Sequence, residues 1–235
     1  MAAIEKLKDF ICEDPRLEVI LDRYNAHFQA RLVDPQLHSD LETAFLELIF
    51  QYFDTPASLN IEKLKSFPLD IILSYLKNTH TYYLEKRLLE IELSIDRVRQ
   101  KYGDDYPVLH TVKLFWSKFG SDLKDHIKEE EHKLFPLAEV LMLKSQQQCP
   151  QRKVYSFPDL GLLNDILKEH EDDELERGIT LFMEYITHSH PDLKKVLSFN
   201  VLALQLETFL HDLEIHRRVE EEVLIPRLTE MLWSE

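Results

Sequence analysis

The apolar residues of this chain recur every three or four positions over long stretches, which is the pattern of helices that bury one face. The clearest stretch begins after Pro68, where Leu69, Ile72 and Leu76 form one stripe. His80 lies on the same stripe, four residues after Leu76, so we expect its side chain to point inward with them. The pattern predicts a helix that continues to about residue 100.

Three breaks divide the remaining pattern into three more long helices. They are the turn-rich stretch KYGDDYP (101–107), the polar stretch SQQQCPQ (145–151) and the stretch THSHP (187–191). Pro and Gly in these stretches disfavour continued helix. We therefore predict a second helix to about residue 143, a third from about 156 to the last break, and a fourth from Asp192 to about Trp233.

An N-terminal helical segment, residues 1–66, precedes this part, and the long helices form a second unit, residues 67–235. The apolar periodicity of residues 13–32 and 39–53 predicts helices there too. The stretch FLELIFQYF is too apolar for water, so we expect it to pack on the long helices or on a second subunit. Only 4 glycines occur in 235 residues, which favours an all-α fold.

Charge and cysteine content restrict the possible partners and compartment. The 43 acidic and 28 basic residues give a net charge of −15, which argues against a nucleic-acid or anionic-membrane surface. No apolar run has the length of a membrane span, and the N-terminus lacks the apolar core of a signal peptide. Two cysteines, Cys12 and Cys149, make no disulfide framework. We expect a cytoplasmic protein; its oligomeric state does not follow from the sequence.

A duplicated motif carries the candidate chemistry. The sequence HIKEEEHKLFP at residues 126–136 returns as HRRVEEEVLIP at residues 216–226. Three pairs of potential metal ligands keep this spacing of ninety residues: His126 and His216, Glu130 and Glu220, and His80 and His170. A fixed spacing that aligns His with His and Glu with Glu indicates an internal duplication that builds a two-fold metal site.

The positions of the breaks predict that the four histidines share one layer. Two residues of an antiparallel helical hairpin lie level when they are equally far from its turn. The midpoints between successive histidines of the set fall at residues 103, 148 and 193, each inside or next to a predicted break. This agreement predicts an up-down-up-down four-helix bundle.

Four imidazoles and two carboxylates form a mixed ligand set that suits Fe, Mn or Zn better than Ca or Mg. In each motif the glutamate follows the histidine by four residues, so both lie on one helix face. Asp122 and Asp212 precede the motif histidines by four residues. Each could accept the second imidazole N–H, or could be an ordinary solvated acid of a helix surface.

The motif H-x-x-x-E-E-x-x-L-[F/I]-P resembles that of hemerythrin-like proteins and, within them, the di-iron repair-of-iron-centres proteins. The resemblance covers about residues 68–230 and places the family's single histidines at His80 and His170. It implies a non-haem centre of two iron ions, rather than Mn or Zn, with an oxo or hydroxo bridge, held by the four histidines and two bridging glutamates. Oxygen-carrying hemerythrins use an asymmetric set with five histidines, which this chain does not show.

The resemblance leaves several functions open. Family members are linked to repair of iron–sulfur clusters damaged by nitric oxide or oxidants, which implies O2 or NO as ligand and damaged iron–sulfur proteins as partners. Many carry an N-terminal Cys-Cys pair, and here Gln29 and Ala30 stand at that place. The hypotheses are therefore a di-iron stress-response protein that donates iron or acts on NO or O2, a non-enzymatic O2, NO or iron binding or sensing module, and a purely structural bundle.

Overall fold

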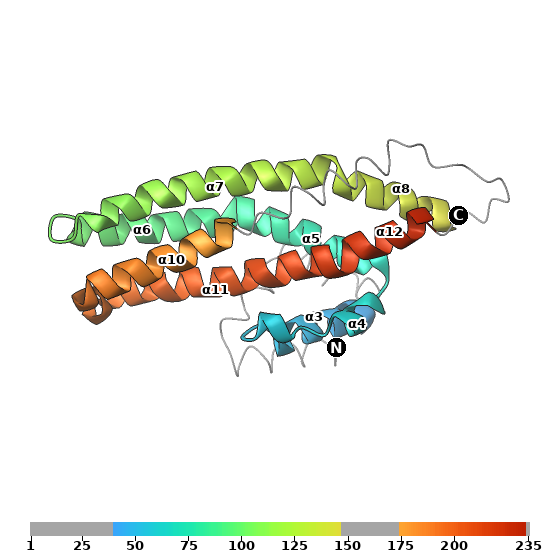
Figure 1. The fold of residues 1–235 in the computed structure, drawn as a ribbon, viewed down its shortest axis with the longest axis horizontal. Helices are drawn as coiled ribbons and strands as arrows, with labels where there is room; N and C mark the ends of the chain where they lie inside the picture. Colours follow the sequence, from blue (N-terminus) through green and yellow to red (C-terminus); the bar gives the residue numbers. More distant parts are fainter. Residues whose placement is uncertain (1–39, 147–173, 234–235) are drawn as a thin grey trace, which may run out of the picture.

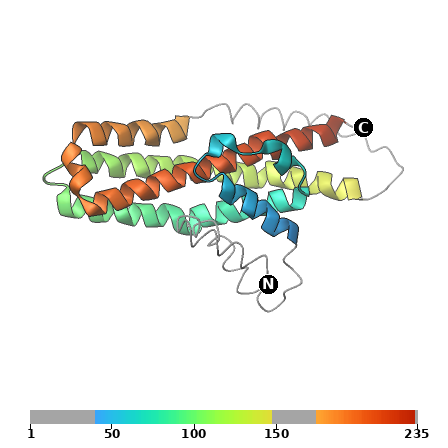
Figure 2. The same cartoon turned by 90° about the horizontal axis from the view of Figure 1, so that it is seen from below.

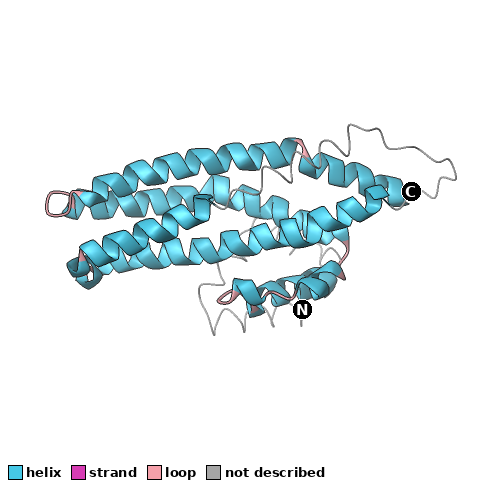
Figure 3. Cartoon of the chain, in the orientation of Figure 1, coloured by secondary structure: helices cyan, strands magenta, loops and turns pink. Residues whose placement is uncertain are grey.

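The structure is a computed structural model that describes residues 40–146 and 174–233, and its secondary structure within them is entirely helical (Figure 3). An all-α fold is therefore confirmed for the described part of the chain. The N-terminal part contains α3 (Asp40–Gln51), the short 3₁₀ helix η3 (Pro56–Ser58) and α4 (Ile61–Lys65). None of the described helices has the length and apolar character needed to cross a membrane.

The first long helical segment follows the predicted stripe. It comprises α5 (Leu69–Tyr82), the π-helical turn η4 (Tyr83–Arg87) and α6 (Leu88–Tyr102). The stripe residues at its start are buried, with Ile72 and Leu76 fully inaccessible. The segment ends at Gly103, and α7 (Val108–His132) begins after the predicted turn. The helix α8 (Leu134–Gln146) continues the second segment.

The third segment is α10 (Glu174–Ser189). The fourth comprises α11 (Leu197–Val219), the π-helical turn η6 (Glu220–Leu224) and α12 (Ile225–Trp233). In Figures 1 and 2 the long segments lie alongside one another, and α6 packs on both α7 and α11 while α10 packs on α7 and α11. The first two residues of the second predicted break, Ser145 and Gln146, still belong to α8. The rest of that break and the expected start of the third helix near residue 156 lie outside the described residues.

The fourth long helix begins later than predicted. The sequence pattern predicts a start at Asp192, but residues Pro191–Lys195 form the 3₁₀ helix η5 and Val196 is extended. Proline at the start of η5 fixes the entry of the chain, and buried Leu193 packs in the core. The α-helix therefore starts at Leu197.

The first described helix, α3, packs on the long helices of its own chain. Its apolar face belongs to the same core cluster as residues of α5, α8 and α12. Phe45 is fully buried, with its ring 5.3 Å from those of Phe67 and Tyr75. Two arginines of the last segment also bond to this region: Arg218 donates to the Pro56 carbonyl, and Arg227 donates to the Phe67 carbonyl at 2.6 Å. The stretch FLELIFQYF is thus covered within one chain.

Gly120 is a residue for which the sequence suggests either a kink or a close approach. The helix α7 runs through it without interruption. A Cβ atom built at this position would meet only Leu88 Cδ2, at 4.0 Å, which is an ordinary contact. No close approach is therefore found, and the glycine lies in an uninterrupted helix with room for a methyl group.

Two apolar clusters fill the core, and a polar layer lies between them. One cluster joins α3 to the ends of the long helices and includes Leu76, Leu134 and Val219. The other runs toward the turn between α6 and α7 and includes Tyr83 and Ile127. His80 of α5, Glu130 of α7 and His216 of α11 each stand between residues of the two clusters along the chain.

Candidate metal centre

His80 is the central residue of the polar layer. It lies near the end of α5 and is fully buried, and its ring stacks on Phe135 with centroids 4.9 Å apart. Its Nε2 atom is 3.1 Å from Nε2 of His216 and 3.0 Å from Oε2 of Glu130. The three helices α5, α7 and α11 therefore each bring one potential metal-ligand atom, a nitrogen or an oxygen, close to the other two.

Glu130 connects two histidines from different helices. Its carboxylate is buried, with Oε2 toward His80 and Oε1 2.7 Å from Nε2 of His126. His126 and Glu130 are four residues apart on α7, so the helix places both on one face. His126 lies at the edge of the layer, with 38% of its side chain exposed.

The second copy of the motif supplies His216 and Glu220. His216 lies in the last turn of α11, and Glu220 is the first residue of η6. Both are buried, and Nε2 of His216 is 3.5 Å from Oε2 of Glu220. The contacts thus form one continuous series from His126 through Glu130, His80 and His216 to Glu220.

Three members of this series meet the geometric requirement for a shared metal ion. His80, Glu130 and His216 each offer a ligand atom, and these atoms lie within 4.8 Å of one another. Five of the six residues predicted as ligands from the sequence therefore occur in one connected polar layer. The sixth, His170, lies outside the described residues.

The two aspartates of the repeat have different surroundings. Asp122 is partly exposed and accepts a hydrogen bond from Lys118 at 2.8 Å, as expected of a solvated helix acid. Asp212 is buried, with 1% of its surface exposed, so the alternative of a solvated acid is wrong for this residue. The two aspartates are therefore equivalent in the sequence repeat but lie in different environments.

Several neighbours of the layer were not predicted from the sequence. Tyr83 is fully buried in η4, and its ring lies edge-on to His216, with centroids 5.9 Å apart. Glu131 lies on the other side of His80, with Oε1 3.4 Å from Nδ1. The spacing rule for the repeat gives no role to Tyr83 or to Phe135, because their proximity comes from the packing of different helices.

The motif helices lose regular α geometry shortly after the glutamate in the first copy and at the glutamate in the second. In the first copy, α7 ends at His132 and α8 begins at Leu134. In the second copy, the π turn η6 starts at Glu220, and the amide of Ile225 bonds to the carbonyl five residues earlier. Such single π turns occur frequently at functional sites. Pro226 is the second residue of α12, and because it has no N–H it cannot donate the backbone hydrogen bond that a regular helix would make there.

An ion pair and a backbone contact hold η6 in place on its outer side. Arg218 donates hydrogen bonds to Glu222, and this contact lowers the pKa of the Glu222 carboxyl below its ordinary value. The same arginine bonds to the Pro56 carbonyl of η3. The turn that carries Glu220 is thereby tied to the N-terminal part of the chain.

Comparison with known proteins does not assign the chain to a family. The chain matches no protein-family model, no curated protein and no solved structure. The resemblance to di-iron proteins therefore rests on the motif residues, and the candidate site rests on the geometry described above.

Proposed function

We propose that this chain is a non-haem di-iron protein whose long helices form an up-down-up-down four-helix bundle around the metal centre. The proposed ligands are His80, His126, Glu130, His170, His216 and Glu220. The observation that carries the proposal is the convergence of His80, Glu130 and His216 from three helices within a buried layer.

The chemistry of the donor set fits a transition-metal ion. Two imidazole Nε2 atoms approach to 3.1 Å, and a carboxylate oxygen lies 3.0 Å from one of them. In a neutral imidazole each ring nitrogen is either a hydrogen-bond donor or an acceptor with a free lone pair. A cation placed between these atoms would be bound by the lone pairs that point toward it. Imidazole together with carboxylate favours Fe, Mn or Zn over Ca or Mg.

Burial gives a second physical argument for a ligand role. A buried carboxylate or imidazole is costly unless it is hydrogen-bonded, paired or bound to a metal. Glu130 directs its two oxygen atoms toward histidines on different helices, which is the orientation required of a bridging carboxylate. Glu220 holds the corresponding position in the second copy of the motif.

The surrounding residues would control access to the bound ions. Phe135 covers one face of His80, and Tyr83 lies against His216, so aromatic rings exclude water from this side of the layer. Bound ferrous iron would supply a centre able to bind and reduce O2 or NO. The chain's own residues would hold the ions, orient the imidazoles and keep the layer dry.

The proposed cellular role follows from the resemblance to repair-of-iron-centres proteins. The protein would act in the response to nitrosative or oxidative stress, by donating iron to damaged iron–sulfur proteins or by acting on NO or O2. A second candidate is a non-enzymatic module that binds or senses O2, NO or iron. Gln29 and Ala30, at the place of the family's cysteine pair, favour this second candidate.

Metal analysis of protein purified without air from iron-replete cells tests the proposal. We expect close to two irons per chain and near-ultraviolet charge-transfer absorption after oxidation. Glu130→Ala and Glu220→Ala should reduce iron content equally, because each removes one bridging ligand. Glu129→Ala is the matched control, since Glu129 lies beside Glu130 but pairs with Lys133 at the surface. A wild-type protein that refuses iron under reducing conditions contradicts the proposal.

A further inference from the structure

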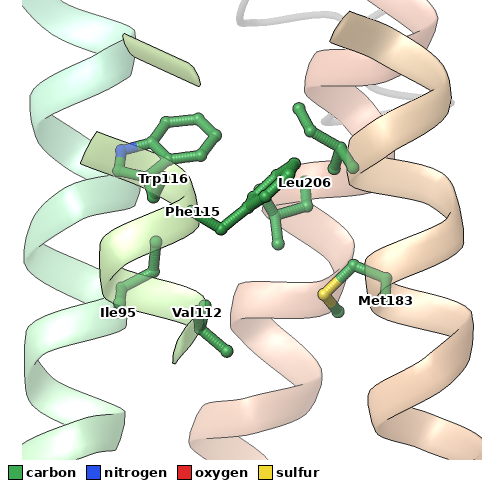
Figure 4. Close-up of a pocket in the computed structure, with 7 residues that line it drawn as sticks. Ile95, Val112, Phe115, Trp116, Met183 and Leu206 are labelled. Carbon is green, nitrogen blue, oxygen red and sulfur yellow. The ribbon is translucent and has the colours of Figure 1, made fainter. Parts of the chain in front are cut away.

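A small apolar pocket lies among four of the long helices (Figure 4). It belongs to the core cluster that runs from the polar layer toward the turn between α6 and α7. The described residues of its wall are all uncharged and come from α6, α7, α10 and α11. The residues that line it are Ile95, Val112, Phe115, Trp116, Ile179, Met183 and Leu206.

The pocket is partly open to solvent, but the described side chains of its wall offer water no oxygen atom and no free N–H group. The only N–H group among the lining side chains belongs to Trp116, and it points to the carbonyl of Leu88, at 3.4 Å. A buried water normally makes about three hydrogen bonds, and apolar cavities without such partners stay dry and accept apolar guests. An uncharged apolar molecule is therefore the guest that this wall favours over water.

The size of the pocket restricts the guest to a very small molecule. The centre of a water-sized molecule has about 10 Å³ in which to move. This is close to the minimum needed to hold one such molecule. Diatomic gases and single noble-gas atoms fit this description, whereas organic substrates and cofactors do not.

One glycine preserves the shape of the wall. A Cβ atom at Gly178 of α10 would lie 3.2 Å from Cζ of Phe115. That distance is shorter than ordinary van der Waals contact, so a side chain at residue 178 would push the Phe115 ring. Glycine at this position lets the ring lie between α7 and α10 beside the pocket.

A series of aromatic contacts leads from the pocket to the candidate metal centre. The Trp116 ring is 5.9 Å from Phe209, and Phe209 is 5.2 Å from Tyr83. Tyr83 in turn lies 5.9 Å from the ring of His216. Trp116, Phe209 and Tyr83 are all buried members of one apolar cluster. The pocket and the ligand His216 are therefore joined by uninterrupted apolar packing.

We propose that this pocket is a docking site for a small apolar gas of the O2 and NO class, and that it supplies the candidate metal centre past Phe209 and Tyr83. The docking step depends only on the apolar wall. The supply step rests on the proposed function, because it needs a centre that binds the gas. The two steps are therefore tested by separate measurements.

Xenon is the probe for docking, because it is apolar, of suitable size and quenches tryptophan fluorescence on contact. The chain has two tryptophans, and Trp233→Phe removes the exposed one, so that Trp116 reports alone. We expect quenching that saturates with xenon pressure, in protein with or without metal. Phe115→Ala enlarges the pocket and should shift saturation to lower pressure. Leu114→Ala, at an exposed neighbouring position, should leave the curve unchanged.

Pocket-filling variants give the opposite expectation. Ile179→Phe should abolish the saturating component, and Met183→Phe, at a less buried and more adaptable position, provides a second variant if the first does not fold. Melting curves confirm folding of each. Quenching of Trp116 that rises linearly with pressure, equally in wild type and in a folded filled variant, overturns the docking site.

The supply step is measured on iron-loaded protein, as the rate of its absorbance change after mixing with dissolved NO or O2. A filled variant should react more slowly while its iron content stays equal to that of wild type. If xenon binding is lost but the rate is unchanged, the pocket does not supply the centre. If the chain takes up no iron, the proposed function fails, and the xenon curves still decide whether the pocket docks an apolar gas.

Discussion

Removal of one carboxylate from the polar layer should remove most of the stability that the fold gains from bound metal. Glu130→Gln keeps the volume of the side chain but replaces the oxygen that faces either His126 or His80 with an amide nitrogen, which does not ligate a metal. Wild-type protein should gain about 4 kcal/mol when free metal exceeds its dissociation constant a thousandfold. For a chain of this size, that gain raises the melting temperature by roughly 8–16 °C.

The assay is thermal unfolding followed by circular dichroism, without air, with and without excess ferrous iron. Glu130→Gln should lose most of the iron-dependent rise. Glu129→Gln is the isosteric control on the neighbouring surface position and should keep it. An equal rise in wild type and Glu130→Gln would refute the reasoning, because the buried histidines and glutamates would then be hydrogen-bonded core residues and the structural-bundle hypothesis would hold.

Three further predictions concern the scaffold. Gly120→Ala should stabilise the protein by about 0.5–1 kcal/mol in urea unfolding, because the added methyl group fits and helix propensity improves; a loss of stability would contradict the open environment. Arg218 lowers the pKa of Glu222 below 4.5, so this pair stabilises the fold above that pH and its contribution is lost as the pH falls through the lowered pKa. Glu222→Gln should remove this acid-dependent loss of stability, which is less than about 1 kcal/mol for so exposed a group. Phe45→Ala should cost about 3–5 kcal/mol, whereas Leu41→Ala on the exposed face of α3 should cost little.

The sequence was sufficient for features that depend on periodicity along one helix. The stripe from Leu69 to Leu76 predicts both α5 and the inward direction of His80, because helical spacing alone decides which side chains share a face. The turns near Gly103 and Pro191 were predicted from residues that interrupt helices. The prediction that His80 and His216 share one layer used equal distances to these turns and to the second predicted break, and the structure brings the two imidazoles to 3.1 Å.

Features that depend on packing between helices could not be predicted in this way. Nothing in the residues of η4 identifies a π turn, and no spacing rule places Tyr83 against His216. Asp122 and Asp212 are equivalent in the repeat, but one pairs with Lys118 at the surface and the other is buried. The fourth helix begins at Leu197, five residues after the predicted start, because the 3₁₀ helix η5 intervenes.

The interruption of both motif helices gives physical meaning to the prolines of the repeat. Pro136 and Pro226 each stand six residues after a motif glutamate. A proline within a helix removes one backbone hydrogen bond and disturbs the preceding turn. In both copies an irregular turn precedes the proline, at Lys133 in the first and at Glu220–Leu224 (η6) in the second. The helix therefore sets the four-residue spacing of histidine and glutamate, and the irregular turn marks the place where the regular α geometry ends in both copies.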